Sequence, residues 1–205
     1  MHSIIIPTNE GDSLAATLWE REDARALVIL HPATAVVQEV YQRFAEYLYE
    51  YGFSVMTYDY RGVGRSKSVI LRSCNVSMSD WMEQDVGCIT AWARSRFPDL
   101  SLLAVGHSVG GYMPAKRLGL GEDLPAPVML QWGRWSAMPG YFYDDPDWDA
   151  RRRAAEVRLP LMVMGFDDDP WANPEAITRL IEPVKNAKID RREIRHADFG
   201  LPSVG

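Results

Sequence analysis

The chain has 205 residues, a formal net charge of −6, 47% hydrophobic residues and 24% charged residues. This length and composition are typical of one globular domain with a sizeable core, so we expect a single domain over residues 1–205. The acidic balance argues against a nucleic-acid partner or an anionic membrane surface. Because no run of about 20 apolar residues occurs, no membrane span is expected.

The opening residues and the cysteines bear on where the protein works. Residues 1–12 lack the basic region, apolar core and small-residue cleavage site of a signal peptide. The two cysteines, Cys74 and Cys88, show no CxxC spacing, which favours free thiols in a reducing compartment over a disulfide. We therefore expect a cytoplasmic protein.

Apolar patterns predict strands and helices that alternate along the chain. Strands are expected at residues 3–7, 14–19, 26–30, 53–60, 100–105, 160–165 and 188–194, the last of these more exposed. Helices are expected at residues 40–51, 80–96 and 175–180. Gly52 is expected to end the first helix, and Ser79 to cap the second. The alternation indicates an α/β fold in which helices flank a mostly parallel sheet.

The segment 117–158 departs from this alternation. It is rich in glycine, proline and aromatic residues, among them Trp132, Trp135, Tyr141 and Trp148. Such a segment between two strands fits a lid over a pocket, and it fits a helical excursion packed on the core equally well. We keep it as a candidate cap and expect at least one of Trp132, Trp135 and Tyr141 to lie near Ser108.

Residues 106–110 form a G-x-S-x-G motif between a predicted strand and a plausible helix. The chain has to turn sharply there, and side chains two positions before and after the serine would collide, so glycine is required at both. The turn exposes the Ser108 hydroxyl at the carboxyl edge of the sheet and directs the Val109 N–H at a developing oxyanion. Ser108 is therefore the candidate nucleophile, with a chance match in a glycine-containing turn as the alternative.

Four segments of the chain resemble the α/β-hydrolase superfamily. They are similar to its first core strand and oxyanion loop, its next strand with a D-x-R-G-x-G-x-S loop, its nucleophile elbow, and its acid-bearing strand and loop. The segments are residues 27–35, 52–68, 102–111 and 160–176. The cap sequences "LGLGEDLP" and "QWGRW" resemble those of one serine-hydrolase-like subgroup. The resemblance implies the α/β-hydrolase fold and a Ser-His-Asp mechanism.

In this fold the triad follows the chain order serine, acid, histidine. The acid is expected after the strand at residues 160–165, where Asp167, Asp168 and Asp169 follow. The resemblance places the acid a few residues before the next helix, which favours Asp169, with Asp168 second and a solvated loop as the alternative. His196 is the one histidine of four that follows this loop. It is the candidate base, with a surface histidine as the alternative.

The resemblance raises a second expectation about the base. In the similar subgroup the histidine lies further along the chain, directly after a glycine, and Gly205 stands where that glycine would be. His196 follows the last predicted strand so closely that we expect its loop to be too short to return to Ser108. The base would then lie beyond Gly205. A core strand expected soon after the elbow is also missing, so the chain either lacks an internal piece and a tail or carries a natural deletion.

The second oxyanion donor is expected in the loop after the strand at residues 26–30. Pro32 has no N–H, so the backbone of Ala33 or Thr34 is the candidate. His31, at the start of this loop, is expected to be a structural histidine, with a place in the pocket as the alternative.

The loop "DYRGVGRS" is expected to be structural. Asp59 and Arg61 are expected to pair, while Gly62 and Gly64 allow tight turns. The loop lacks both the G-x-G-x-x-G pattern and a P-loop lysine, so no nucleotide is expected to bind there.

Together these patterns predict a cofactor-independent serine hydrolase that cleaves a small-molecule acyl substrate through an acyl-enzyme intermediate. Esters are favoured over thioesters and amides because the candidate cap is aromatic and apolar. No metal is implied, since histidines and carboxylates show no H-x-x-x-H spacing. The alternative from another class is a binding module that keeps the fold without a competent histidine.

Overall fold

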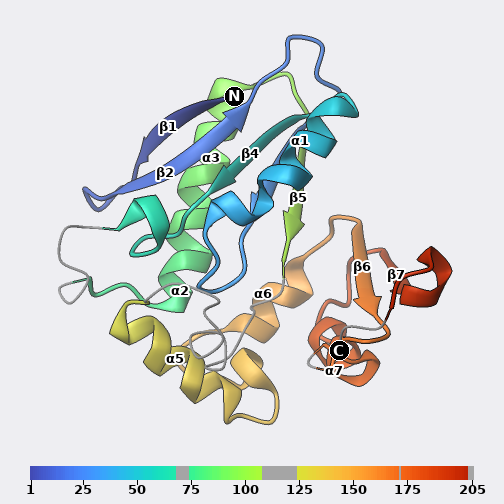
Figure 1. Ribbon diagram of the computed structural model, residues 1–205. Helices are drawn as coiled ribbons and strands as arrows, with labels where there is room; N and C mark the ends of the chain where they lie inside the picture. The colour runs from blue at the N-terminus through green and yellow to red at the C-terminus, as the bar shows by residue number, and fades with distance from the viewer. Residues whose placement is uncertain (68–73, 108–123, 171, 203–205) are drawn as a thin grey trace. The chain divides into compact units, whose positions relative to one another are not determined.

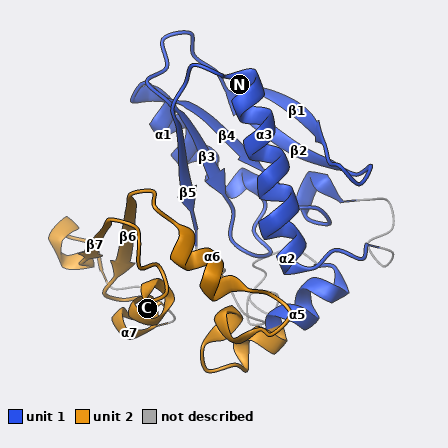
Figure 2. Cartoon of the chain, turned by 180° about the vertical axis from the view of Figure 1, so that it is seen from behind, with its two compact units in different colours: residues 1–132 blue, residues 133–205 orange. Residues whose placement is uncertain are grey.

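The computed structural model describes residues 1–67, 74–107, 124–170 and 172–202. Its contacts divide the chain into two compact units, residues 1–132 and 133–205 (Figure 2). The expectation of one domain with a cap therefore stays a prediction, and the architecture is that of each unit by itself.

The first unit is built on a five-stranded sheet with the order β1-β2-β4-β3-β5 (Figure 1). Its strands are β1 (His2–Pro7), β2 (Ser13–Trp19), β3 (Leu27–His31), β4 (Ser54–Tyr58) and β5 (Leu102–Gly106). β2 pairs antiparallel with both β1 and β4, whereas β3 pairs parallel with both β4 and β5. The strands expected in this part of the chain are all confirmed, and so is the α/β architecture.

The two faces of β3 bury alternate residues, as the period of two in a strand requires. Leu27 and Ile29 belong to a core cluster with the helix that follows β4. Val28 and Leu30 belong to the opposite cluster, which includes Ala45 of the helix between β3 and β4. Helices cover both faces, so a continuous apolar run here is the pattern of a buried parallel strand.

The helices of this unit are α1 (Gln42–Glu50), preceded by the 3₁₀ turn η1 (Gln38–Tyr41), and α3 (Val86–Arg96). Gly52 has φ of +89°, the left-handed conformation expected of a residue that ends a helix. The single helix expected at residues 80–96 is three consecutive segments, α2 (Met78–Asp80), the π-helical η4 (Trp81–Asp85) and α3.

The N-cap of this helix is Ser77 and not the expected Ser79. The Ser77 hydroxyl accepts a hydrogen bond from the Asp80 N–H, and the Asp80 carboxylate accepts one from the Ser77 N–H. This reciprocal capping box begins the helix two residues before the expected cap. The hydroxyl of Ser79 instead bonds to Gln131.

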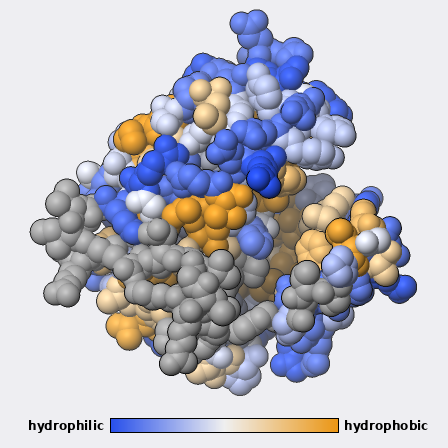
Figure 3. Space-filling view, viewed as in Figure 1, coloured by the Kyte–Doolittle hydropathy of each residue, from blue (hydrophilic) through white to orange (hydrophobic). Residues whose placement is uncertain are grey.

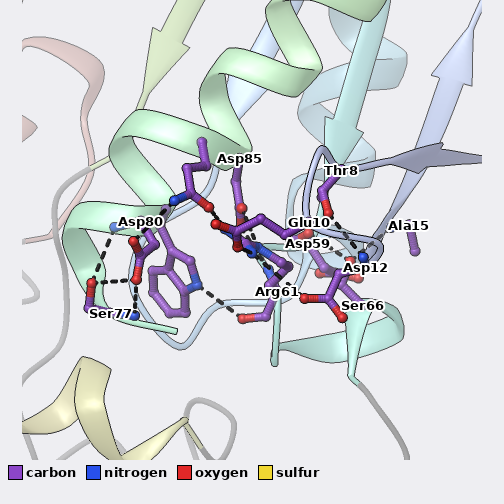
Figure 4. A network of polar contacts seen from close by, with 12 residues as sticks. Thr8, Glu10, Asp12, Ala15, Asp59, Arg61, Ser66, Ser77, Asp80 and Asp85 are labelled. Atoms are coloured by element: carbon purple, nitrogen blue, oxygen red, sulfur yellow. Dashed lines mark hydrogen bonds and ion pairs between the residues drawn. The ribbon is translucent and has the colours of Figure 1, made fainter. Parts of the chain in front are cut away.

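The loop after β4 is held by a buried arginine, Arg61 (Figure 4). Arg61 donates from Nε to Asp85 at 2.6 Å and from Nη1 to Glu10 at 2.7 Å. Its backbone N–H also donates to Asp85, at 2.9 Å. The expected pairing of Arg61 with Asp59 is replaced by this one, because the helical segment after the loop brings the Asp85 carboxylate to the guanidinium while other groups bind the Asp59 carboxylate.

Asp59 has a different set of partners in the same loop. Its carboxylate accepts hydrogen bonds from the backbone and the side chain of Gln38, both at 2.8 Å, and from the Arg65 N–H at 3.0 Å. Gly64 has φ of +47°, and a Cβ there would stand 2.6 Å from the Asp59 carboxyl carbon. Gly62 also has a positive φ, +79°. The structural role expected for this loop is confirmed.

We expect Asp85→Ala to lower the free energy of unfolding by about 3 kcal/mol at pH 8, because it leaves a buried guanidinium without its main partner. Burial raises the pKa of Asp85 to about 6, so its carboxyl group is ionised at that pH. The matched control is Asp190→Ala, which breaks an exposed pair with Arg192 and should cost less than about 1 kcal/mol. Urea denaturation measures the free energy of unfolding of each variant. An equal loss in the two variants would show that the pair of Arg61 and Asp85 is not a main stabilising contact.

The second unit contains a parallel pair of strands, β6 (Leu161–Phe166) and β7 (Ile189–Ile194). Between them runs α7 (Pro174–Ile181), whose N-cap Asn173 accepts a hydrogen bond from the Ala176 N–H at 3.0 Å. These three elements match the strand, helix and more exposed final strand expected from the sequence.

The described part of the candidate cap is helical. It consists of α5 (Ala126–Ser136), the 3₁₀ turn η5 (Tyr141–Asp144) and α6 (Ala150–Glu156). Trp135 is fully buried, stacks on Trp148 with ring centroids 5.3 Å apart, and donates its indole N–H to Asp145. Trp135, Phe142 and Trp148 thus form a small aromatic core within the second unit. A position of the cap over the pocket stays a prediction.

The connection between β2 and β3 forms a hydrophilic part of the surface of the first unit. Residues 20–25, between β2 and β3, carry five charged side chains, and Figure 3 shows hydrophilic residues over the corresponding top of the molecule in this view. Among the helices that the structure describes, none is long and apolar enough to cross a membrane.

Candidate active site

The G-x-S-x-G motif begins where β5 ends. The strand closes at Gly106, and the His107 N–H continues its pairing by donating to the His31 carbonyl at 3.1 Å. A strand therefore leads into the motif, as an elbow requires. Ser108 and Val109 themselves lie outside the described residues, so their roles stay predictions.

The loop after β3 lies beside this strand end, because β3 and β5 are parallel neighbours. Its first residue, His31, hydrogen-bonds through Nδ1 to the Tyr58 hydroxyl at 2.8 Å. Burial lowers the pKa of His31 to about 4, so the ring is neutral at physiological pH. This satisfied, neutral ring fits the structural role expected for His31.

The candidate oxyanion donors of this loop are both buried: Ala33 is 2% exposed and Thr34 is 4% exposed. The Ala33 N–H donates to the Tyr41 hydroxyl at 2.8 Å. That hydroxyl also lies 2.9 Å from Nδ1 of His107. The expected donor thus reaches the motif through a tyrosine hydroxyl that the sequence analysis did not single out.

In the second unit a carboxylate and a histidine meet after two parallel strands. Asp167 is the first residue after β6, and His196 is the second after β7. The strands are in register at Phe166 and Ile194, and the Asp167 N–H donates to the Ile194 carbonyl at 3.1 Å. Parallel strands end at the same edge of their sheet, so the two residues are neighbours at the carboxyl edge.

The contact between them has the geometry of an acid that orients a base. Nδ1 of His196 is 3.0 Å from Oδ1 of Asp167, and the His196 backbone N–H donates to the same oxygen at 3.1 Å. The hydrogen bond from His196 holds the pKa of Asp167 below its ordinary value, so the carboxylate is ionised at neutral pH. With Nδ1–H directed at Asp167, the other ring nitrogen, Nε2, is the one left to accept a proton.

Asp169, which spacing favoured as the acid, has a local structural partner. Its Oδ1 accepts a hydrogen bond from the Ala172 N–H at 2.9 Å, in the turn that leads to α7. The carboxylate found on His196 is instead that of Asp167, two residues earlier. The end of β6 determines which aspartate contacts His196. The first residue after a strand lies beside the neighbouring strand, whereas later residues follow the loop away from it. The role expected for Asp169, and for Asp168 as second choice, stays a prediction that the geometry does not favour.

One segment of the chain matches a known protein family. Residues 22–127 match the model of the family described as serine aminopeptidase, S33, and this segment is more than half of the 205 residues. The chain belongs to the S33 serine aminopeptidase family. This confirms membership of the α/β-hydrolase superfamily. No curated protein matches this S33 family member significantly.

Solved structures share its fold. An esterase of Pyrococcus furiosus, Pf2001, has a TM-score of 0.62 and 18% identity, over 95% of this chain and 83% of that chain. Est1E of Butyrivibrio proteoclasticus, solved with ferulic acid, has a TM-score of 0.62 and 18% identity, over 94% and 90%. XC6422 of Xanthomonas campestris, described as a serine hydrolase without a lid, has a TM-score of 0.52 and 18% identity, over 95% and 85%. At this identity the likeness supports the α/β-hydrolase fold.

Among the residues that the structure describes, no group of three or more His, Cys, Asp or Glu side chains is arranged to hold a metal ion. The chemistry that the described residues can perform is proton transfer by an oriented imidazole and hydrogen bonding to a developing anion.

Proposed function

We propose that this S33 family member is a serine hydrolase that cleaves a small-molecule carboxylic ester through an acyl-enzyme on Ser108. The observation that carries the proposal is the hydrogen bond between Asp167 and His196 at the ends of β6 and β7. An imidazole held in one tautomer by an ionised carboxylate is the partner that a serine hydroxyl needs in order to act as a nucleophile. The motif at residues 106–110 follows the end of another strand, β5.

In this proposal each residue has one role. Ser108 attacks the ester carbonyl while Nε2 of His196 takes its proton, and His196 then returns that proton to the leaving alcohol. His196 is proposed as the base in place of a histidine beyond Gly205, because its ring is already oriented by Asp167. Asp167 orients the imidazole and stabilises its protonated form, which is the part that the sequence analysis gave to Asp169. Water then enters, His196 takes a proton from it, and the oxygen of the water attacks the acyl carbon. The bond between the acyl carbon and Ser108 Oγ breaks, His196 gives its proton to Oγ, and the acid leaves.

The charge that develops on the carbonyl oxygen needs donors on the opposite side of the site. The Val109 N–H is one, by the geometry of an elbow. The second donor was expected from Ala33 or Thr34, in the loop after β3. The buried Ala33 N–H is hydrogen-bonded to the Tyr41 hydroxyl.

Esters are proposed as the bond cleaved, and not the peptide bond of an N-terminal residue that the family description suggests. One of the structural relatives, Pf2001, is named as an esterase, and another, Est1E, was solved with ferulic acid, an aromatic acid. Esters also have better leaving groups than amides, so a site with no further assistance cleaves them faster. The proposed partner is a small acyl substrate, and no cofactor takes part.

A panel of chromogenic substrates tests the proposed function. We expect hydrolysis of p-nitrophenyl acetate, butyrate and octanoate, with an initial burst of nitrophenol that equals the enzyme concentration if acylation is the faster step. Amino-acid p-nitroanilides should be cleaved far more slowly. Faster cleavage of the anilides would make the protein an aminopeptidase, and no turnover of any ester would favour the alternative of a binding module.

A further inference from the structure

The Tyr41 hydroxyl occupies the space between two segments that the proposed mechanism brings together. It accepts a hydrogen bond from the Ala33 N–H at 2.8 Å and lies 2.9 Å from Nδ1 of His107. Ala33 belongs to the loop after β3, and His107 directly precedes Ser108. Tyr41 itself closes the turn η1 that leads into α1.

The position of this hydroxyl is constrained by two contacts of its ring. The ring packs against the core cluster between the sheet and α1, and it meets the His107 ring edge-on, with centroids 5.8 Å apart and planes at 77°. A side chain that packs in this way has lost its rotamer freedom before substrate arrives. Such pre-organisation is what makes a donor effective in a transition state.

The hydrogen bonds also define which group is free to act. The Ala33 N–H has one hydrogen, and that hydrogen is used by the Tyr41 oxygen. Which of the two groups donates across the contact between the Tyr41 hydroxyl and Nδ1 of His107 depends on the His107 tautomer. In either case the hydroxyl hydrogen of Tyr41 can rotate about the C–O bond without moving any heavy atom. The mobile donor on this side of the site is therefore the phenol and not the amide behind it.

We propose that the Tyr41 hydroxyl is the second oxyanion donor of this enzyme, with the Ala33 N–H bound to its oxygen and strengthening it. The inference rests on the proposed function, since it needs an oxyanion formed at Ser108. On substrate attack the hydroxyl hydrogen of Tyr41 turns to the carbonyl oxygen, while Val109 donates from the elbow. No proton is transferred to the oxyanion in this step.

Two physical effects favour the phenol in this role. A hydroxyl that accepts a hydrogen bond becomes a stronger donor, because each bond polarises the next. Burial raises the pKa of the Tyr41 hydroxyl, against a smaller lowering by the Ala33 hydrogen bond. The group therefore keeps its hydrogen through the neutral and mildly alkaline range in which a serine hydrolase works.

The test is Tyr41→Phe, which removes the hydroxyl and keeps the ring. We expect kcat for p-nitrophenyl butyrate to fall by about 10²–10³-fold, with KM changed little, as for the loss of one oxyanion donor. Tyr51→Phe is the matched control: Tyr51 is 59% exposed at the far end of α1, and its replacement should leave kcat unchanged. Titration of active sites with a fluorophosphonate corrects kcat for any unfolded fraction.

Two results would overturn the inference while the proposed function stands. One is a Tyr41→Phe enzyme with wild-type kcat per active site, which would make the hydroxyl a structural partner of Ala33. The other is a faster enzyme, which would mean that the hydroxyl blocks the Ala33 N–H from donating to the oxyanion.

If Tyr41→Phe does not fold, replacement of Tyr41 by 3-fluorotyrosine keeps the hydroxyl and lowers its pKa. A kcat unchanged by that replacement from pH 6 to pH 10 would also overturn the inference. A wild-type protein that hydrolyses no ester would overturn both proposals.

Discussion

Asp167→Asn is expected to lower kcat for ester hydrolysis by about 10⁴-fold. The amide keeps the shape of the carboxylate but loses its charge, so it no longer favours the imidazolium that forms on His196 in the transition state. It can also hold the ring in the wrong tautomer by donating to Nδ1. The loss should be confined to activity, since Asp167 is a partly exposed residue whose pairing with His196 contributes little to stability.

Asp169→Asn is the matched control two residues along the same loop. Its Oδ1 accepts from the Ala172 N–H, and an asparagine oxygen can accept the same hydrogen bond. We expect kcat within a few-fold of wild type. Steady-state kinetics of the two variants on one p-nitrophenyl ester decide between them, and a larger loss in Asp169→Asn would restore the assignment made from spacing to the helix.

Ser108→Ala is expected to reduce kcat by about 10⁶-fold, because removal of the nucleophile costs as much as removal of the whole triad. The residual rate over water then comes from the oxyanion donors and substrate binding alone. The substitution removes a single oxygen atom, so the melting temperature should stay close to that of the wild type. Activity retained above a few per cent would show that another group attacks the ester.

Local patterns predicted the elements of this fold well, because each element carries its own signal. The apolar runs that became β3 and β4 are buried on both faces, and alternating helices had to cover them. The start of the helix before α3 was missed by two residues, since Ser77 and Ser79 are equally good caps by residue type. Only the return contact from Asp80 distinguishes them.

The site was harder to predict, because its contacts join residues that are far apart in the sequence. Tyr41 and His107 are 66 residues apart and Asp167 and His196 are 29 apart, so no local pattern marks either pair. One signal was available for the second pair. A residue that directly follows a parallel strand lies beside the end of the neighbouring strand, and that rule selects Asp167 over Asp169.

The partner of Arg61 illustrates the same limit. The sequence offered Asp59, two positions away, whereas the folded chain supplies Asp85 from the helix that packs on the loop. Both carboxylates are fully buried, and the fold gives Asp59 to Gln38 and Arg65 and Asp85 to Arg61. A buried charge needs a partner, but the tertiary fold decides which one it meets. The glycines of this loop were predictable because their positive φ values follow from the turn itself.

Labelling with a fluorophosphonate tests the central claim most directly, since this reagent reacts only with a serine that a base has activated and needs no knowledge of the substrate. The wild-type protein is expected to gain one phosphonyl group by intact mass, to lose its esterase activity in proportion, and to carry the adduct on Ser108 in the peptide map. Ser108→Ala should gain none, and Asp167→Asn should react far more slowly. A wild-type protein that stays unlabelled, or that carries the adduct on another residue, would contradict the account.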